Sequence, residues 1–226
     1  MKLATFLTCS TFCHASPTTL YKDTFENDLS QWIIEQAPPG NTFLKKGKLV
    51  ILDASGCTVW FKHKLKGPIK IDFEATLVDQ GGPYDRVSDL NCFWMATHPK
   101  QPNLFTQNSR TGTFTQYHPL RLYYVGYGAN HNTTTRFRRY PGDGTRPCLP
   151  QHDLSDPQFL HTPNTTLKIT ILSEGARQRY LCNGKTVFDY TDPSPLTEGW
   201  FGFRTVNNHL VIDNFHVTLL PPANNK

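Results

Sequence analysis

The sequence predicts an all-β protein, a β-sandwich of two antiparallel sheets in the jelly-roll arrangement. Short segments in which apolar and polar residues alternate recur along the 226 residues, and turn-forming residues separate them. Only 18% of the residues are charged and 12% are aromatic, with many Gly and Pro, a composition typical of strands and loops. Bias toward helix-forming residues is weak throughout the chain.

Eleven segments have the pattern of strands, and turn formers separate them. In chain order they are residues 49–53, 58–64, 69–78, 89–96, 121–127, 134–140, 166–173, 177–182, 186–190, 199–206 and 210–219. Asn183-Gly184 is the clearest two-residue hairpin turn. Residues 97–119 and 141–163 lack the strand pattern, and long loops in a compact domain are often functional.

The first residues resemble a short signal peptide, residues 1–15, with Lys2, an apolar stretch and Ala15 at the cleavage point. Residues 16–220 are predicted to form a single jelly-roll catalytic domain and residues 221–226 a flexible tail. No later segment reaches the roughly 20 apolar residues of a membrane span. We therefore expect a secreted, extracellular and monomeric protein that does not bind membranes.

Four cysteines remain after the predicted cleavage. Cys57 and Cys92 lie in apolar, strand-like segments and are expected to be buried thiols, whereas Cys148 and Cys182 lie in or beside loops and can form a disulfide. No Cys or His spacing is typical of a zinc site, so we expect neither a metal nor a cofactor.

The net charge of +5 favours an anionic partner. The basic residues do not form the Lys/Arg runs that follow nucleic acid, so we expect an acidic polysaccharide or oligosaccharide and no nucleic acid. The alternative is a surface charge that only keeps the protein in solution.

Alternation within the strands predicts one polar sheet face. In residues 134–140, Arg136, Arg138 and Tyr140 lie opposite the core residue Phe137, and in residues 199–206 Trp200 and Arg204 share the outer face. The same reasoning for residues 89–96 predicts an inner set of Leu90, Cys92, Trp94 and Ala96 and an outer set of Asn91, Phe93 and Met95. In residues 121–127 both sets are aromatic, and alternation does not decide which Tyr faces outward.

We expect this face, with Asn91, Arg136, Arg138, Tyr140 and Arg204, to hold the carboxylate of a uronate sugar, because the planar Arg guanidinium pairs with a carboxylate through two hydrogen bonds. The alternative is a set of solvated surface Arg residues.

Cleavage by β-elimination needs a group that neutralises the carboxylate, a base and an acid. The catalytic candidates are His209, Tyr124, Arg138 and Asn91, and the substrate-binding candidates are Arg86, Arg136, Tyr140, Arg204, Trp200, Tyr127, Asn130, His131 and His118.

Three blocks of residues, 85–96, 122–140 and 199–206, carry a specific combination of Arg, Tyr and Asn. Over residues 21–219 the sequence resembles a family of secreted, concanavalin-like jelly-roll proteins associated with polysaccharide utilisation in bacteria, with some fungal relatives. The resemblance implies a polysaccharide lyase acting at glucuronate, including rhamnose-capped glucuronate. The Gln-x-His and Tyr-x-Lys strands of jelly-roll alginate and glucuronan lyases are not present, since Tyr124-Val125-Gly126 lacks the Lys.

Two other functions remain open. A glycoside hydrolase needs two carboxylates beside the scissile bond, and the strands rich in Arg and Tyr carry none. A non-catalytic carbohydrate-binding module also uses aromatic and Arg side chains on a sheet, although the length of the chain and its two long loops favour an enzyme.

Overall fold

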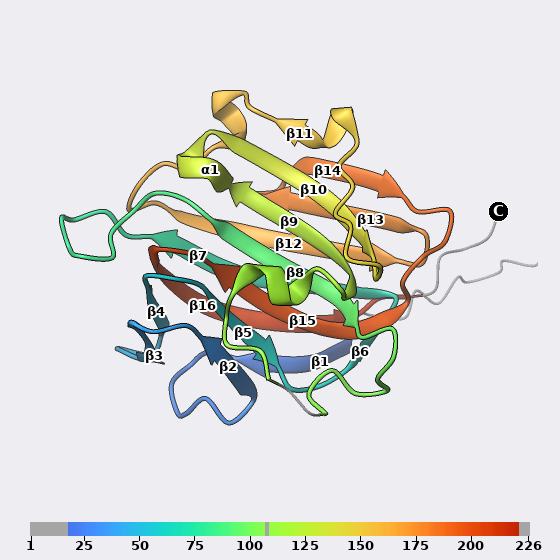
Figure 1. Ribbon diagram of the computed structural model, residues 1–226, viewed down its shortest axis with the longest axis horizontal. Coiled ribbons are helices and arrows are strands. Elements are labelled where there is room, and N and C mark those ends of the chain that lie inside the picture. Colours follow the sequence, from blue (N-terminus) through green and yellow to red (C-terminus); the bar gives the residue numbers. More distant parts are fainter. Residues whose placement is uncertain (1–17, 107–108, 222–226) are drawn as a thin grey trace, which may run out of the picture.

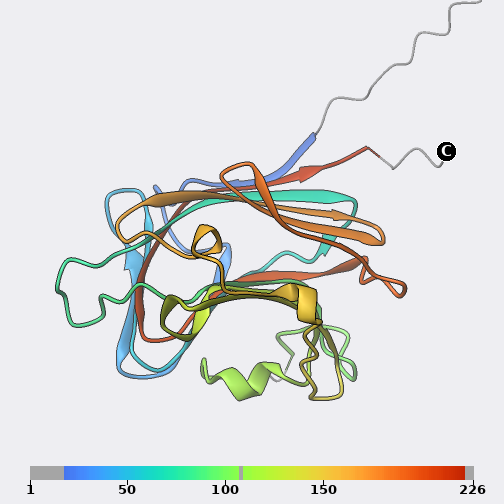
Figure 2. The ribbon, with the colours of Figure 1, turned by 90° about the horizontal axis from the view of Figure 1, so that it is seen from above.

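The protein is described by a computed structural model that covers residues 18–106 and 109–221. Two antiparallel sheets of eight strands each pack face to face, which confirms the predicted all-β sandwich (Figure 1). Figure 2 shows the two layers from the side. The predicted signal peptide and residues 222–226 of the predicted tail lie outside the described residues. No helix in the described part of the chain is both long and apolar enough to cross a membrane.

The first sheet has the strand order β14-β13-β12-β7-β16-β4-β3, and β1 also pairs with β16. Its strands are β1 (Thr18–Asp23), β3 (Gly40–Leu44), β4 (Leu49–Asp53), β7 (Ile69–Leu77), β12 (Thr166–Glu174), β13 (Arg177–Cys182), β14 (Lys185–Thr191) and β16 (Asn208–Leu219).

The second sheet, which carries the site described below, has the order β11-β10-β9-β8-β15-β5-β2, and β6 also pairs with β15. Its strands are β2 (Trp32–Gln36), β5 (Cys57–Phe61), β6 (Leu65–Lys66), β8 (Leu90–Thr97), β9 (Arg121–Gly128), β10 (Thr134–Pro141), β11 (Asp153–Leu154) and β15 (Glu198–Thr205). Four short helical segments lie in the connections: η1 (Phe114–Tyr117), α1 (Ala129–Asn132), η2 (Pro150–His152) and η3 (Pro157–Phe159).

All eleven predicted strands are present, with ends shifted by a few residues at most. The Asn183-Gly184 hairpin is confirmed: both residues have positive φ, 50° and 77°, between β13 and β14. Strands β1, β2, β3, β6 and β11 were not predicted. β6 and β11 have only two residues each, and in β2 the residues Trp32, Ile33 and Ile34 follow one another without alternation.

Apolar residues of both sheets fill the space between them, as alternation predicts for Leu90, Cys92, Trp94, Phe137, Phe201 and Phe203. The prediction for Met95 and Ala96 was wrong. Met95 lies in this core, whereas Ala96 belongs to a second apolar cluster on the outer face. A β-bulge explains the exchange, because the pairing of β8 shifts between Trp94 and Thr97 and Met95 has a φ of +50°.

The connection from β8 to β9 covers the outer face of the second sheet, where Figures 1 and 2 show it outside the strands. Leu104, Tyr117 and Leu120 from this connection pack on Trp60, Phe93 and Trp200 of the sheet. The buried Glu35 of β2 anchors the connection. Its carboxylate accepts hydrogen bonds from the Tyr117 hydroxyl (2.7 Å), Trp60 Nε1 (3.0 Å) and Arg110 Nη2 (2.8 Å).

Cys148 and Cys182, which the sequence allowed to pair, do not form a disulfide. Cys57, Cys92, Cys148 and Cys182 are all free thiols, and Cys57 and Cys92 are buried as predicted. Cys182 ends β13 in the first sheet, whereas Cys148 follows β10 of the second sheet and its Sγ lies 3.7 Å from the Phe137 carbonyl oxygen. The two thiols therefore belong to different layers.

Candidate functional site

One row of paired residues crosses four strands on the outer face of the second sheet. Arg136 of β10 pairs with Gly126 of β9, Gly126 with Asn91 of β8, and Asn91 with Arg204 of β15. Gly126 has no side chain, so the row has a gap between its polar members. A cavity of about 280 Å³ lies over this gap. Its lining residues are Asp89, Asn91, Phe114, Tyr124, Gly126, Ala129, Asn130, Arg136, Arg138, Arg146, Arg204 and Val206.

The next row along the strands supplies Tyr124. Arg138 of β10 pairs with Tyr124 of β9, which pairs with Phe93 of β8. The Tyr124 ring lies along its own strand, because a Cβ added to Gly126 would stand 2.4 Å from the Tyr124 hydroxyl oxygen. Its ring packs against Phe93 and Tyr140, with centroids 5.6 and 5.8 Å away. The structure thus selects Tyr124, which alternation had left open, as the tyrosine of β9 that lines the cavity.

Burial raises the pKa of Tyr124, and the nearby Arg204 and Arg138 offset this effect only in part. The phenol is therefore neutral at neutral pH. Its hydroxyl makes no hydrogen bond with the described residues, so it can donate one to a group in the cavity.

Arg204 is fixed and buried, with 1% of its surface exposed. Its Nη1 donates to Thr58 Oγ1 (3.0 Å) and to the Gly112 carbonyl oxygen (2.6 Å). The guanidinium lies over the rings of Phe114 and Tyr117, at 5.0 and 4.9 Å from their centroids. Its Nη2 is buried without a hydrogen-bond partner among the described residues. This Nη2 lies on the covered side of the guanidinium, because a Cβ added to Gly56 would stand 3.1 Å from it.

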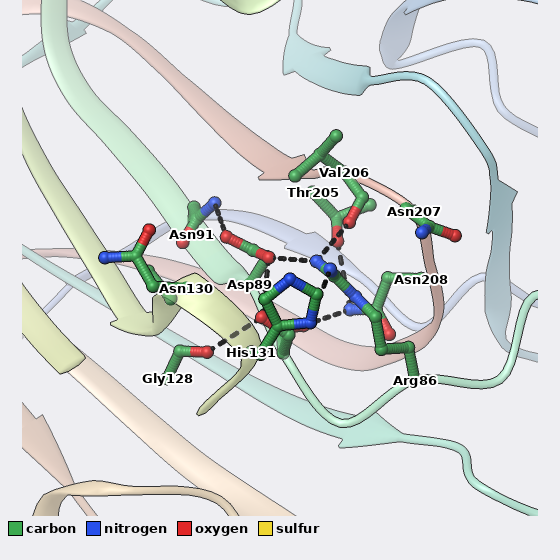
Figure 3. A network of polar contacts seen from close by, with 12 residues as sticks. Arg86, Asp89, Asn91, Gly128, Asn130, His131, Thr205, Val206, Asn207 and Asn208 are labelled. Atoms are coloured by element: carbon green, nitrogen blue, oxygen red, sulfur yellow. Dashed lines mark hydrogen bonds and ion pairs between the residues drawn. The ribbon is translucent and has the colours of Figure 1, made fainter. Parts of the chain in front are cut away.

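Asn91 and Asp89 lie beside each other at the start of β8, as Figure 3 shows. Asn91 Nδ2 lies 3.4 Å from Asp89 Oδ1, and Asn91 Oδ1 is buried with no partner in the described part of the chain. The Asp89 carboxylate accepts hydrogen bonds from Ser88 Oγ (2.6 Å) and from Arg86. Arg86 also donates to the Val206 carbonyl oxygen (3.0 Å). The charge of Asp89 is therefore balanced by Arg86, which is not a lining residue.

The cavity is strongly positive. Four Arg side chains line it, and Asp89 is the single carboxylate among its described lining residues. Arg136 Nε donates to Asp153 Oδ1 (2.8 Å), Arg138 donates to the Arg146 carbonyl oxygen, and the Arg146 guanidinium lies 5.0 Å from the Phe114 ring centroid. No group of three or more His, Cys, Asp or Glu side chains suited to a metal ion occurs within residues 18–106 and 109–221.

Six of the predicted site residues line this cavity: Asn91, Tyr124, Asn130, Arg136, Arg138 and Arg204. Arg146, Asp89 and Phe114 were missed. Arg146 and Phe114 come from the two long loops, whose lengths were the signal for function, but loops have no periodicity that predicts where a side chain points. Asp89 lies two residues before Asn91 and on the same face, so alternation could have identified it, although it directly precedes β8 and has a φ of +60°.

His209, which the sequence offered as a catalytic candidate, is not among the lining residues of the cavity. The chain turns at Asn207, with a φ of +46°, and enters β16 of the first sheet. There His209 Nδ1 lies 2.7 Å from Asp85 Oδ1. Burial raises the pKa of Asp85, but hydrogen bonds from the Gln80 amide, His209 and the Gly82 amide outweigh it, so the pKa is lowered.

Three aromatic candidates are also displaced from the cavity. Tyr127 points into the core between the sheets, where its ring stacks on Tyr180 at 6.1 Å. Trp200 is on the outer face as predicted, but it packs against Phe105 at 5.6 Å and its Nε1 donates to the Lys62 carbonyl oxygen. Tyr140 shares the face of Arg136 and Arg138 but is fully buried in the outer apolar cluster.

The remaining candidates lie around the cavity without lining it. Arg86 holds Asp89, and the exposed His131 lies 3.5 Å from Arg86 through Nδ1 (Figure 3). The His118 ring packs edge-on against Phe114, one of the lining residues, with ring centroids 5.1 Å apart. Burial lowers the pKa of His118, and the nearby Arg146 and Arg204 lower it further.

Solved structures show the fold of this chain. A protein of unknown function with a galectin-like fold from Bacillus subtilis is 18% identical, with a TM-score of 0.72, over 92% of this chain and 100% of that one. The carbohydrate-binding module CBM66 from B. subtilis is 14% identical with a TM-score of 0.56, covering 84% and 96% of the two chains. For the endo-β-1,3-glucanase from Pyrococcus furiosus the identity is 11%, the TM-score 0.60, and the coverage 92% and 96%.

These likenesses confirm a galectin-like and concanavalin-like β-sandwich. No curated protein sequence matches the chain. Residues 51–215, which include every lining residue of the cavity, match the family described as "Domain of unknown function (DUF6250)". The chain belongs to the DUF6250 family.

Proposed function

We propose that the cavity binds an acidic sugar residue of a glycan and holds its carboxylate among Arg138, Arg204 and Asn91. One observation carries this proposal: four Arg side chains surround a single cavity whose only described carboxylate, Asp89, is already paired with Arg86. An isolated positive cavity of this kind favours an anion, and an Arg fork suits a carboxylate.

The other walls suit a sugar ring. Tyr124 and Phe114 present aromatic rings to the CH groups of a pyranose, while Asn91 and Asn130 offer amide groups to its hydroxyls. The volume of about 280 Å³ lies just below the roughly 300–1,000 Å³ of sites for drug-sized ligands. Two proteins with this fold, a carbohydrate-binding module and a glucanase, also support a glycan as the ligand.

Calorimetric titration with a glucuronate oligosaccharide and with its carboxyl-reduced form tests this function. We expect binding of the acidic form, weak or no binding of the reduced form, and a loss of at least about tenfold in affinity in Arg138→Gln, or about 1.4 kcal/mol. Arg177→Gln is the matched control, because Arg177 pairs with Asp189 on the other sheet. Equal affinity for the acidic and reduced forms would refute the proposal.

A second candidate function is cleavage of the bound uronate by β-elimination. The observation that favours it is the Tyr124 hydroxyl, which lines the same cavity as the Arg residues. Arg138 and Arg204 would neutralise the carboxylate and acidify the C5 proton, and Asp89 is the lining carboxylate that can accept this proton. The electrons form the C4–C5 double bond, the C4–O bond breaks, and the neutral Tyr124 gives its proton to the leaving oxygen. Solvent returns the proton from Asp89 to Tyr124.

Two signals followed in parallel separate the enzymatic alternatives. Ultraviolet absorbance of the unsaturated uronate and reducing ends rise together for a lyase, and reducing ends rise alone for a hydrolase. Binding without either signal identifies a binding protein. For a lyase, Tyr124→Phe and Asp89→Asn should abolish turnover while the affinity for the glycan stays close to that of the wild type. Full turnover in both variants would exclude this mechanism.

A further inference from the structure

The row of residues that forms the floor of the cavity continues beyond Arg204, but the cavity does not. Arg204 pairs with Thr58 of β5, and Thr58 pairs with Glu35 of β2. Both continue the row toward the edge of the sheet, yet Thr58 is 0% exposed and Glu35 is 2% exposed. The floor is therefore covered from Arg204 onward.

The segment that covers this end is residues 111–117, called here the end wall. The Gly112 carbonyl oxygen accepts the hydrogen bond from Arg204, and Phe114 lies over the Arg204 guanidinium. The end wall is pressed on the sheet edge, because a Cβ on Gly112 would lie 2.2 Å from the Gly56 carbonyl oxygen and 2.8 Å from the Ala37 nitrogen. The hydrogen bond from Tyr117 to the buried Glu35 fixes it from below.

The sides along the strands are also bounded. On one side stand Tyr124 and the buried Phe93, whose ring stacks on Trp60 at 5.5 Å. On the other side Asp89 donates its backbone amide to the Gly128 carbonyl oxygen, which joins the start of β8 to the turn that carries Ala129 and Asn130.

The opposite end is open. Asn130, an exposed lining residue, lies in α1 between β9 and β10. Asp153, the partner of Arg136 at the edge strand β11, is also exposed. The mouth of the cavity therefore faces the β10–β11 edge of the sheet, and the closed end lies at Arg204.

From this shape we infer that the cavity takes the end of an acidic glycan chain rather than an internal residue. This inference rests on the proposed function and refines it. The terminal uronate enters toward Arg204 and Phe114, and the rest of the chain leaves past Asn130 and Arg136 over the sheet edge. An internal residue would need a second exit where the end wall closes the row.

Titration of glucuronate oligosaccharides of increasing length tests the inference, with the dissociation constant expressed per chain. Each linear chain has one end of each kind, so we expect a constant that does not change with length. A dissociation constant per chain that falls in proportion to the number of sugar residues would show internal binding. That result would overturn the inference while leaving the proposed function intact. No binding at any length would overturn the proposed function as well.

Truncation of Phe114 in the end wall should change how the dissociation constant depends on the length of the oligosaccharide. In Phe114→Ala the closed end is opened, and we expect the dissociation constant per chain to fall with length. Phe105→Ala is the matched control, because Phe105 belongs to the same connection but packs on Trp60 and Trp200 away from the cavity. Length-independent binding by a folded Phe114→Ala protein would contradict the role of the end wall.

Discussion

Gly126 occupies the position on which the cavity depends most. It stands between Arg136 and Asn91 in the row across the sheet, and the Tyr124 side chain lies over it. Any side chain here would fill the cavity and push the Tyr124 ring away. The glycine is required for this close approach rather than for an unusual backbone angle.

We predict that Gly126→Ala lowers the affinity for an acidic oligosaccharide by at least about tenfold. The added Cβ would stand 2.4 Å from the Tyr124 hydroxyl oxygen, so the ring must move. Tyr124→Phe leaves the ring over Gly126 and should keep most of the affinity. Calorimetry measures both variants, and wild-type binding by Gly126→Ala would show that the position of Tyr124 is unimportant.

His161 makes the stability sensitive to acid. Its Nε2 lies 2.9 Å from the Tyr127 carbonyl oxygen, and burial lowers its pKa from 6.5 to about 4. The unfolded chain therefore binds a proton in a pH range where the folded protein does not. The stabilisation is fully present above pH 6.5 and is lost as the pH falls toward about 4.

For this group we expect a decrease in the free energy of unfolding of about 3 kcal/mol over that range. Urea denaturation at a series of pH values measures it. His161→Gln should flatten the dependence, whereas the exposed His63→Gln should not. The same slope in wild type and His161→Gln would assign the acid sensitivity to other groups.

Single residues of the site were predictable where a regular strand carries them. Arg136, Arg138, Asn91 and Arg204 lie on the predicted face because alternation along a strand fixes the face without knowledge of the topology. The same reasoning failed at Met95, where a bulge adds a residue. His209 follows Arg204 closely in the sequence, but the chain crosses to the other sheet between them. Alternation could not decide whether Tyr124 or Tyr127 faces outward, because both faces of β9 are apolar.

At the scale of elements, the connection between β8 and β9 turns the outer face of a sheet into a cavity. It supplies Phe114, and the buried Glu35 of β2 holds it through Arg110 and Tyr117. Its importance was predictable from its length, but its path was not, because the strand that anchors it has no alternating pattern. The edge strand β2 and the connection are therefore one structural unit.

We predict that Glu35→Gln destabilises the protein by about 3–5 kcal/mol, the usual cost of breaking a buried ion pair by removing one of its charges. Limited proteolysis should then cut first within residues 97–120. Arg177→Ala, which breaks an exposed ion pair, is the control and should leave both properties near those of the wild type. Chemical denaturation that gives equal stability for Glu35→Gln and wild type would contradict the anchoring role.

At the scale of the whole molecule, the net charge of +5 and the four Arg side chains of the cavity act in the same direction. The net charge alone did not distinguish an anion-binding protein from a merely soluble one. The four Arg side chains that line one cavity on the outer face of the second sheet are the basis for proposing an anionic ligand.

We expect the affinity for a glucuronate oligosaccharide to fall as the salt concentration rises, because ions screen the attraction between the Arg residues and the carboxylate. Titrations at increasing sodium chloride measure this dependence, with the carboxyl-reduced oligosaccharide as the ligand control. An affinity independent of salt would show that charge does not drive binding.

The proposed function depends on where the carboxylate of the sugar binds, and a crystal structure of the complex with a short glucuronate oligosaccharide tests this most directly. We predict that the carboxylate of a terminal residue lies within hydrogen-bond distance of Arg138 or Arg204, with the sugar ring between Tyr124 and Phe114. A sugar bound elsewhere, or one whose carboxylate points away from all four Arg residues, would contradict the account.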